Sequence, residues 1–380
     1  MKIGPISKTT MTSFVALWIG LSSGTATASQ ADEQPSVAVL TQKAEQGDAQ
    51  AQTVLGSLYF LGDGVPRDTS AALVLLTKAA NQGYAIAQAN LGMIYRKGKD
   101  VKQDYAIAAS WYQKAAIQGH ADAQNNLASM FANGEGVTQD FAVAIEWYRK
   151  SAAQGNAEAQ NSLGKIYFFG QGAPKDGSIA ASWFKKASDQ GFVKAQFNLA
   201  QMYANGDGLA KDTALAAIYY RKAADQGDSS AQYALGMMYY KGDGLPQDYA
   251  SALIWTKKSA EQGDPRAQGT LGAAYVTGAG VKKDDQTAIV WLQKAAEQGD
   301  ATAQKNLSIM YFCCHGLGRD YVHAHMWANL SASRTDDPTT RAGALAIREQ
   351  TAALMGPSKT AEAQALASAW LEKHPDPRAK

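Results

Sequence analysis

The residues best suited to chemistry lie close together near the C-terminal end. Cys313, Cys314 and His315 are consecutive, and His323 and His325 follow shortly after. Thiolates and imidazoles this close can bind a soft metal ion. However, zinc sites usually space their cysteines by about two to four residues, and adjacent cysteines cannot easily occupy two tetrahedral corners. A strained vicinal disulfide is a further possibility. A metal site, a disulfide and incidental packing therefore all stay open.

A second chemically capable set is an aspartate that recurs every 36 residues. Metal binding or acid–base catalysis would need a partner group at each copy, and no second carboxylate recurs beside it. An aspartate directly before a helix accepts hydrogen bonds from free amides of the first turn, and this is worth about 1 kcal/mol. We therefore interpret the set as helix N-caps. Its members are Asp68, Asp104, Asp140, Asp176, Asp212, Asp248, Asp284 and Asp320.

The sequence contains no recognisable catalytic set. It has no nucleophile elbow, no phosphate-cradling glycine loop before a helix and no HExxH motif. Paired glycines such as Gly62 and Gly64 follow expected helices, so they indicate helix ends and not a dinucleotide-binding turn. We predict neither an enzyme nor a bound cofactor.

These residues must be positioned by a repeating unit. A leucine recurs with a constant spacing of 36 residues and without insertion or deletion. Self-similarity at such a period is typical of a stacked helical repeat array. The eight copies are centred on Leu55, Leu91, Leu127, Leu163, Leu199, Leu235, Leu271 and Leu307.

Each unit predicts two antiparallel helices, A and B. In the first copy, helix A covers residues 49–61 after the N-cap Asp48, and Gly62 ends it. Helix B then covers residues 69–82 and ends at Gly83. One position in each helix is alanine in all copies, which indicates close helix contact. Two aromatic columns are expected to fill the core. The first is Trp111, Trp147, Trp183, Tyr219, Trp255, Trp291 and Trp327, and the second runs through helix A from Tyr59 to Tyr311.

Units of the form AxAQxxLGxxYxxGxGVxxDxxxAxxWxxKAAxQG resemble Sel1-like repeats, which are relatives of tetratricopeptide repeats. The resemblance implies an all-α fold, a right-handed α-solenoid of antiparallel helix pairs that binds other proteins. In exported bacterial members it implies adaptor, signalling, envelope or host-interaction roles. The chain departs from the pattern at Asp100 and Cys314, which replace turn glycines. The cysteine pairs of the penicillin-binding branch of cysteine-rich Sel1-like proteins are also absent from its repeats.

Four segments are expected along the chain. Residues 1–28 read as a signal peptide, with a basic start, an apolar stretch too short for an ordinary membrane span and Ala26-Thr27-Ala28 before the cleavage point. An uncleaved anchor is the alternative. Residues 29–47 form a polar leader and a capping helix, 48–335 the eight repeats, and 336–380 a closing helix pair, predicted at 342–354 and 359–371, with a tail.

Charge excludes one class of partner. The net charge is +2, with both signs interspersed and no long basic run, so we expect no nucleic-acid binding. Removal of the signal peptide leaves a chain near neutral and without a membrane-spanning segment. We expect an exported monomer that is located in the periplasm, with secretion as the alternative.

In a solenoid, constant columns build the fold and variable columns build the site. The variable positions of helix A in copies four to six are rich in aromatic residues and methionine, which suits a partner-binding surface on the concave wall. They could equally pack against neighbouring helices. The candidate residues are Asn161, Lys165, Phe168, Phe169, Phe197, Gln201, Tyr233, Met237, Tyr240 and Lys241.

The sequence therefore favours a non-enzymatic scaffold of the bacterial envelope that binds a protein or peptide. Two alternatives remain. One is a cell-wall-related ligand-binding protein or β-lactamase-like enzyme, and the other is a secreted factor that binds a host protein.

Overall fold

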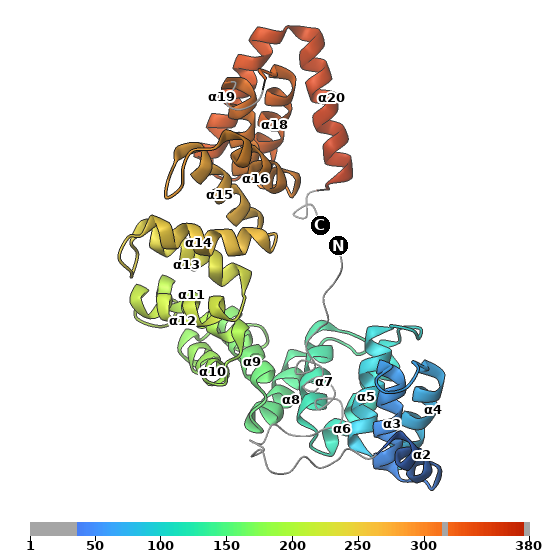
Figure 1. Cartoon of the computed structure of the whole chain (residues 1–380). Coiled ribbons are helices and arrows are strands. Elements are labelled where there is room, and N and C mark those ends of the chain that lie inside the picture. Colours follow the sequence, from blue (N-terminus) through green and yellow to red (C-terminus); the bar gives the residue numbers. More distant parts are fainter. Residues whose placement is uncertain (1–35, 314–317, 376–380) are drawn as a thin grey trace. The chain divides into compact units, whose positions relative to one another are not determined.

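The computed structural model describes residues 36–313 and 318–375, and these residues form nineteen α-helices and no strand (Figure 1). Neighbouring helices pack in tandem pairs, which confirms the expected all-α repeat fold. The chain divides into two compact units at Phe192 and Val193. The predicted signal peptide lies outside the described residues.

The first unit contains helix A and helix B of copies one to four, preceded by one extra helix. In this unit the A helices carry odd labels and the B helices even labels. The helices are α2 (Val37–Glu45), α3 (Ala49–Leu61), α4 (Thr69–Asn81), α5 (Ala85–Lys97), α6 (Tyr105–Ile117), α7 (Ala121–Asn133), α8 (Phe141–Ala153), α9 (Ala157–Phe169) and α10 (Gly177–Asp189).

The second unit contains copies five to eight, followed by two longer helices. The helices are α11 (Val193–Asn205), α12 (Thr213–Asp225), α13 (Ser229–Lys241), α14 (Tyr249–Glu261), α15 (Pro265–Thr277), α16 (Asp285–Glu297), α17 (Ala301–Cys313), α18 (Tyr321–Arg334), α19 (Pro338–Met355) and α20 (Pro357–Lys373).

An aspartate side chain begins every B helix. In copy one, Oδ1 of Asp68 accepts a hydrogen bond from the backbone N–H of Ala71 at 2.9 Å. The other seven aspartates make the same bond to the third residue beyond them, at 2.9–3.2 Å. The prediction that this column caps helices is confirmed, so these carboxylates are part of the fold.

The turn between helix A and helix B requires a left-handed backbone. Gly136 in copy three has φ of +69°, and a Cβ there would lie 2.3 Å from the carbonyl carbon of Tyr105 in the preceding copy. Glycine satisfies both constraints. Copy two has Asp100 instead, also at positive φ (66°), and its carboxylate forms an ion pair with Arg67. Aspartate tolerates this region better than most residues, and the ion pair gives it a partner.

Small residues allow the two helices of a copy to approach closely. The alanines predicted to mark these contacts are buried, and Ala72, Ala87 and Ala180 are fully so. A Cβ on Gly92 of α5 would lie 2.7 Å from the Tyr112 ring of α6, so the ring of helix B occupies the space that this glycine leaves open.

The ring that fills this space stands one position after the tryptophan column. This second column was not singled out by the sequence analysis, because the more conspicuous tryptophans stand beside it. Its large members are 8% exposed or less, and these are Leu76, Tyr112, Tyr148, Phe184, Tyr220 and Leu292.

The tryptophan column itself differs from the expectation. Trp255 and Trp327 are buried, but Trp111, Trp147 and Trp183 are only half-buried. In five copies, the Nζ of a lysine three residues later lies over the tryptophan ring, 4.0–4.3 Å from the ring centroid. The column therefore forms a shared boundary between core and solvent, held by cation–π contacts. Most aromatic residues of the helix-A column are half-buried as well.

A buried glutamine of helix A, paired with an exposed glutamine at the end of helix B, connects three successive helices. Nε2 of Gln124 in α7 donates to the backbone carbonyl oxygen of Ala116 in α6 at 3.0 Å. Its Oε1 accepts from Nε2 of Gln154, at the end of α8, at 2.8 Å. The same two bonds recur with constant separations of eight and thirty residues. In copy one the carbonyl belongs to Ala44, so α2 takes the place of a preceding B helix.

This glutamine pairing ends at copy eight. Gln304 still donates to Ala296, but Oε1 of Gln304 is buried and has no hydrogen-bond partner in the described part of the chain. The residue thirty positions later is Arg334 and not glutamine. Arg334 instead donates to the carbonyl oxygen of His374 and lies 4.6 Å from the Trp370 ring centroid. It therefore attaches α20 to the end of the array.

The closing helices begin earlier than predicted. α19 begins at Pro338 after the N-cap Asp337, whose carboxylate accepts from the N–H of Thr340 at 2.6 Å, and α20 begins at Pro357. Proline is well tolerated at the first helical position because its missing N–H has no partner there. Both helices contact α18. Among the described helices, none is both long and apolar enough to span a membrane.

Loss of one glutamine pair should destabilise the first unit. Gln124→Met keeps the volume of the side chain but leaves the Ala116 carbonyl and the Gln154 amide without this partner. We expect a loss of about 1–3 kcal/mol in the free energy of unfolding, measured by urea titration followed by circular dichroism. Gln171→Met, at an exposed turn position, is the matched control. Equal stability of the two variants would contradict a structural role for the pair.

Enlarging a helix contact should have a comparable effect. Ala180 is fully buried, so Ala180→Leu must displace its neighbours and should cost about 1–3 kcal/mol. Ala142→Leu makes the same change at an exposed position of α8 and should leave the unfolding midpoint nearly unchanged. A midpoint for Ala180→Leu that matches the control would show that this contact has unused space.

Candidate functional site

The predicted partner-binding residues of the first unit lie on α9. Asn161 is buried (6% exposed), whereas Lys165 is exposed. The Phe168 and Phe169 rings meet edge to face with their centroids 5.0 Å apart, and Lys175 Nζ lies 5.7 Å from the Phe168 centroid. Phe169 is 61% exposed, which makes it the most open of these aromatic rings.

Two predicted residues of the second unit lie on α11. Phe197 is half-buried and packs on Tyr220 of α12, with ring centroids 5.7 Å apart. Gln201 is exposed. In copy five, therefore, the variable position of Phe197 contributes partly to packing.

Three of the four predicted residues of α13 line a groove between copies six, seven and eight. Tyr233 and Met237 are half-buried, Tyr240 is 44% exposed, and Lys241 is exposed. Tyr233, Met237 and Tyr240 line the groove, whose volume is about 420 Å³. This is within the size range of sites that take small ligands or single side chains.

Missing side-chain volume creates this groove. Thr256 of α14 stands in the column that holds Tyr112, Tyr148, Phe184 and Tyr220 elsewhere. Ala274 of α15 stands where the other copies have leucine, isoleucine or methionine. Gly269, two residues before the central leucine, removes a third side chain. All three line the groove, and Ala252 and Leu271 complete its most deeply buried lining.

Sequence reasoning identified the aromatic wall of the groove but not its floor. The signal was present as three small residues in columns that are large in other copies. Each of these small residues stands in a different column of the repeat, and the sequence does not show that the three columns adjoin. Only the packed structure brings them together.

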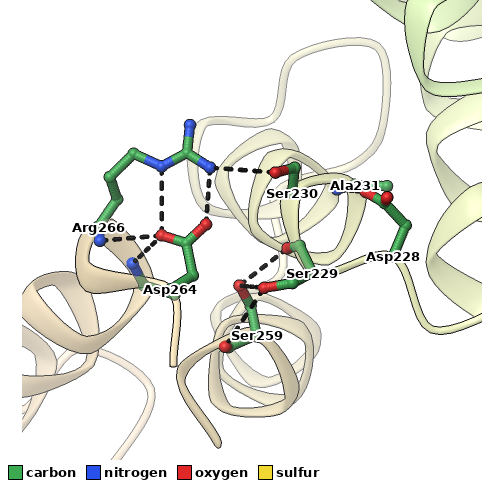
Figure 2. A network of polar contacts seen from close by, with 8 residues as sticks. Asp228, Ser229, Ser230, Ala231, Ser259, Asp264 and Arg266 are labelled. Atoms are coloured by element: carbon green, nitrogen blue, oxygen red, sulfur yellow. Dashed lines mark hydrogen bonds and ion pairs between the residues drawn. The ribbon is translucent and has the colours of Figure 1, made fainter. Parts of the chain in front are cut away.

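Arg266, which lines the groove, forms an ion pair with Asp264 (Figure 2). Arg266, near the start of α15, donates from Nη2 to Oδ2 of Asp264 at 2.6 Å and from Nε to Oδ1 at 3.2 Å. Nη2 also reaches Ser230 of α13 at 3.4 Å, and the guanidinium lies 4.8 Å from the Tyr233 ring centroid. The ion pair therefore connects copies six and seven and holds the Tyr233 ring.

The carboxylates near the groove have different pKa shifts. Burial alone would raise the pKa of Asp264, but the hydrogen bonds from Arg266 and from the backbone lower it below its usual range. Burial raises the pKa of Asp300, and the nearby Asp264 carboxylate acts in the same direction. Asp300 also caps α17 by accepting from Ala303 at 2.7 Å. The groove lining therefore includes one basic side chain, Arg266, and one acidic side chain, Asp300.

The structure places the predicted cysteine and histidine residues in different surroundings. Cys313 is exposed at the end of α17, while Cys314 and His315 lie outside the described residues. Nδ1 of His323 donates to Oδ2 of Asp320 at 2.6 Å, and its ring stacks on Tyr311, with centroids 5.4 Å apart. Within residues 36–313 and 318–375, no group of three or more His, Cys, Asp or Glu could hold a metal ion. The disulfide stays a prediction.

His325 is buried between α18 and α19. Its side chain is 2% exposed, and Nδ1 lies 3.1 Å from the carbonyl oxygen of Arg348 and 3.1 Å from Oγ1 of Thr351. Nε2 is buried and without a hydrogen-bond partner in the described part of the chain. Burial lowers the pKa of His325, and the charge of Arg348 acts in the same direction. This imidazole is therefore a neutral packing group of the closing helices.

Comparison with known proteins gives a consistent result. The family model described as Sel1 repeat matches eight consecutive segments: 49–84, 85–120, 121–156, 157–192, 193–228, 229–264, 265–300 and 301–336. Two crystal structures are similar at 31% sequence identity, each covering 90% of this chain and 95% of the other. One is a protective antigen of uropathogenic Escherichia coli with an SLR fold (TM-score 0.56), and one is a Sel1 repeat protein from Oxalobacter formigenes (TM-score 0.60). No curated protein matches the chain.

His325 should make the stability of the chain depend on pH. Its pKa is lower in the folded chain than the unfolded value of about 6.5. The unfolded chain therefore takes up a proton first as the pH falls, and stability is lost from about pH 6.5 down to the folded pKa. The loss should be about 1.4 kcal/mol for each unit of pKa difference.

The measurement is urea unfolding at several pH values between neutral and mildly acidic, for the natural chain and for His325→Gln. Glutamine can keep a hydrogen bond to the Arg348 carbonyl but does not titrate, so the variant should lose less stability on acidification. His120 is half-buried, also has a lowered pKa and is common to both chains, so the difference between them isolates His325. Parallel pH profiles would contradict the prediction.

Proposed function

This chain belongs to the Sel1 repeat family, and we propose that it is a non-enzymatic scaffold that binds a partner protein or peptide through A-helix residues. Sel1 repeats generally mediate protein–protein interaction, and Sel1-repeat scaffold proteins are typically not enzymes. The contact face would be the concave wall lined by A helices, without a cofactor or a nucleic acid.

The observation that carries this proposal is an exposed aromatic ring at a variable position of an A helix in each of the two units. Phe169 is 61% exposed in the first unit, and Tyr240 is 44% exposed beside the groove of the second unit. Exposed apolar groups that gather beside a groove usually mark a binding surface, because burying them against a partner is favourable. Lys165 in the first unit, and Gln201 and Lys241 in the second, would form polar contacts beside the exposed ring of their own unit.

The cellular location is part of the same proposal. We place the chain in the bacterial envelope, in the periplasm after cleavage before Ser29, and as a monomer. A secreted factor that binds a host protein is the second candidate, favoured by the similarity to the protective antigen of uropathogenic Escherichia coli. Fractionation of the native cell, with the mass of the mature chain, would distinguish periplasmic, secreted and anchored forms.

The binding surface can be tested by crosslinking and pull-down from envelope extract. The double variants Phe168→Ala with Phe169→Ala, and Met237→Ala with Tyr240→Ala, remove exposed apolar groups from one unit each. If these groups contact a partner, the amount of partner captured should fall about tenfold or more in at least one double variant. Anchoring aromatic residues contribute about 1–2 kcal/mol or more to binding.

Ile117→Ala is the matched control, because Ile117 is 69% exposed on a B helix. Circular dichroism melting should show that all variants stay folded. Capture that is unchanged in both double variants would exclude this surface. Covalent labelling by penicillin, or steady hydrolysis of it, would instead support an enzyme.

A further inference from the structure

We propose that the groove of copies six to eight is a socket for a tyrosine side chain of the partner polypeptide. This inference rests on the proposed function, because it names the group that the partner inserts. The socket is formed by Thr256, Ala274 and Gly269 on its floor and by Tyr233, Met237 and Tyr240 on its wall.

The size of the socket follows from the repeat itself. In copy five, the ring of Tyr220 packs edge to face on Phe197, with centroids 5.7 Å apart. The corresponding residues of copy six are Thr256 and Tyr233. Tyr233 therefore keeps its place while the ring that would pack on it is missing. In three of the other copies this missing ring is a phenol, as in Tyr112, and the cavity is open to a ring from outside.

The floor carries a polar group without a partner. Thr256 is 4% exposed and lines the groove, and its hydroxyl makes no hydrogen bond in the described part of the chain. A purely apolar occupant would cut this hydroxyl off from water and leave it unsatisfied, which is unfavourable. An occupant with a hydrogen-bonding group at its tip would satisfy it. Among aromatic side chains, tyrosine has its hydroxyl at the tip.

Charge around the socket disfavours ionised side chains. The Arg266 guanidinium is neutralised by Asp264, which it binds through two hydrogen bonds. Arg266 and Asp300 line the same groove, so a charged side chain of either sign would approach a group of like charge as well as one of opposite charge. Arg266 already pairs with Asp264, and Asp300 already accepts from the backbone N–H of Ala303, so a charged occupant would have to compete with these bonds and an uncharged occupant fits best.

The walls favour an aromatic ring over an aliphatic chain. Tyr233 and Tyr240 can contact an inserted ring edge to face or in an offset stack, and the sulfur of Met237 can contact its edge. Both kinds of contact add to the burial of apolar area. The asymmetric socket, polar at its floor and aromatic at its wall, therefore matches a phenol in orientation.

The test uses the full mature chain and the tripeptides acetyl-Gly-Tyr-Gly-amide and acetyl-Gly-Phe-Gly-amide, with binding measured by ligand-observed NMR. We expect a Kd on the order of 1 mM for the tyrosine peptide, since one side chain supplies most of the contact. The phenylalanine peptide should bind about three- to tenfold more weakly, which is the effect of one net hydrogen bond.

Three variants separate filling of the socket from loss of its hydroxyl. Thr256→Tyr restores the residue that stands at this position in copy five, and Ala274→Met restores that of copies three, five, six and eight. Both should fold normally and abolish binding of the tyrosine peptide. Thr256→Val keeps the shape of threonine and should remove the preference for tyrosine over phenylalanine, while both peptides still bind.

Equal binding of the two peptides to the natural chain would overturn the proposal, as would undiminished binding to Thr256→Tyr. Binding of p-cresol without binding of either peptide would show that the groove takes a free small phenol and not a partner side chain. Failure here is distinct from failure of the proposed function. If Thr256→Tyr still captures the partner while the α9 or α13 variants do not, the scaffold function stands without the socket.

Discussion

The buried glutamine of helix A is the interaction on which the rest of the structure depends. In most copies it bonds, as Gln124 does, to a carbonyl eight residues before it and to a glutamine thirty residues after it. Both partners lie at helix ends, and an insertion anywhere in that span would separate a buried donor from its acceptor. Because an unsatisfied buried polar group is costly, the pairing gives a physical reason for the unvarying 36-residue period.

Because the period is fixed, the copies differ mainly in the size of the side chains at their helix contacts. In most copies a glycine or small residue of helix A receives a large residue of helix B, as Gly92 receives Tyr112. Copy six keeps the glycine but has Thr256 in place of the ring, and copy seven has Ala274 in place of a large aliphatic residue. The helices stay in place because the glutamine pair Gln232 and Gln262 is intact, at 2.7 Å. A cavity therefore remains where a less constrained fold would collapse.

Most residues that look capable of chemistry serve the fold. The recurring aspartates cap helices, His120 accepts from the N–H of Ala123 at 3.3 Å, and His325 packs the closing helices. Arg334 ends the glutamine pairing and attaches α20. These side chains solve the same problem, which is to satisfy helix ends and buried polar atoms at each junction of the array.

The sequence by itself determined the period, the helix ends, the caps and the family, because these follow from local backbone chemistry and from self-similarity that any one copy repeats. It also placed Tyr233, Met237 and Tyr240 at variable positions. The tertiary structure decided which ring of helix B is buried, since the tryptophans and their neighbours differ by one position and only packing selects the inner one. It also decided where the groove lies. Thr256, Gly269 and Ala274 are small residues in separate columns, and they form one space only because α14 and α15 pack side by side.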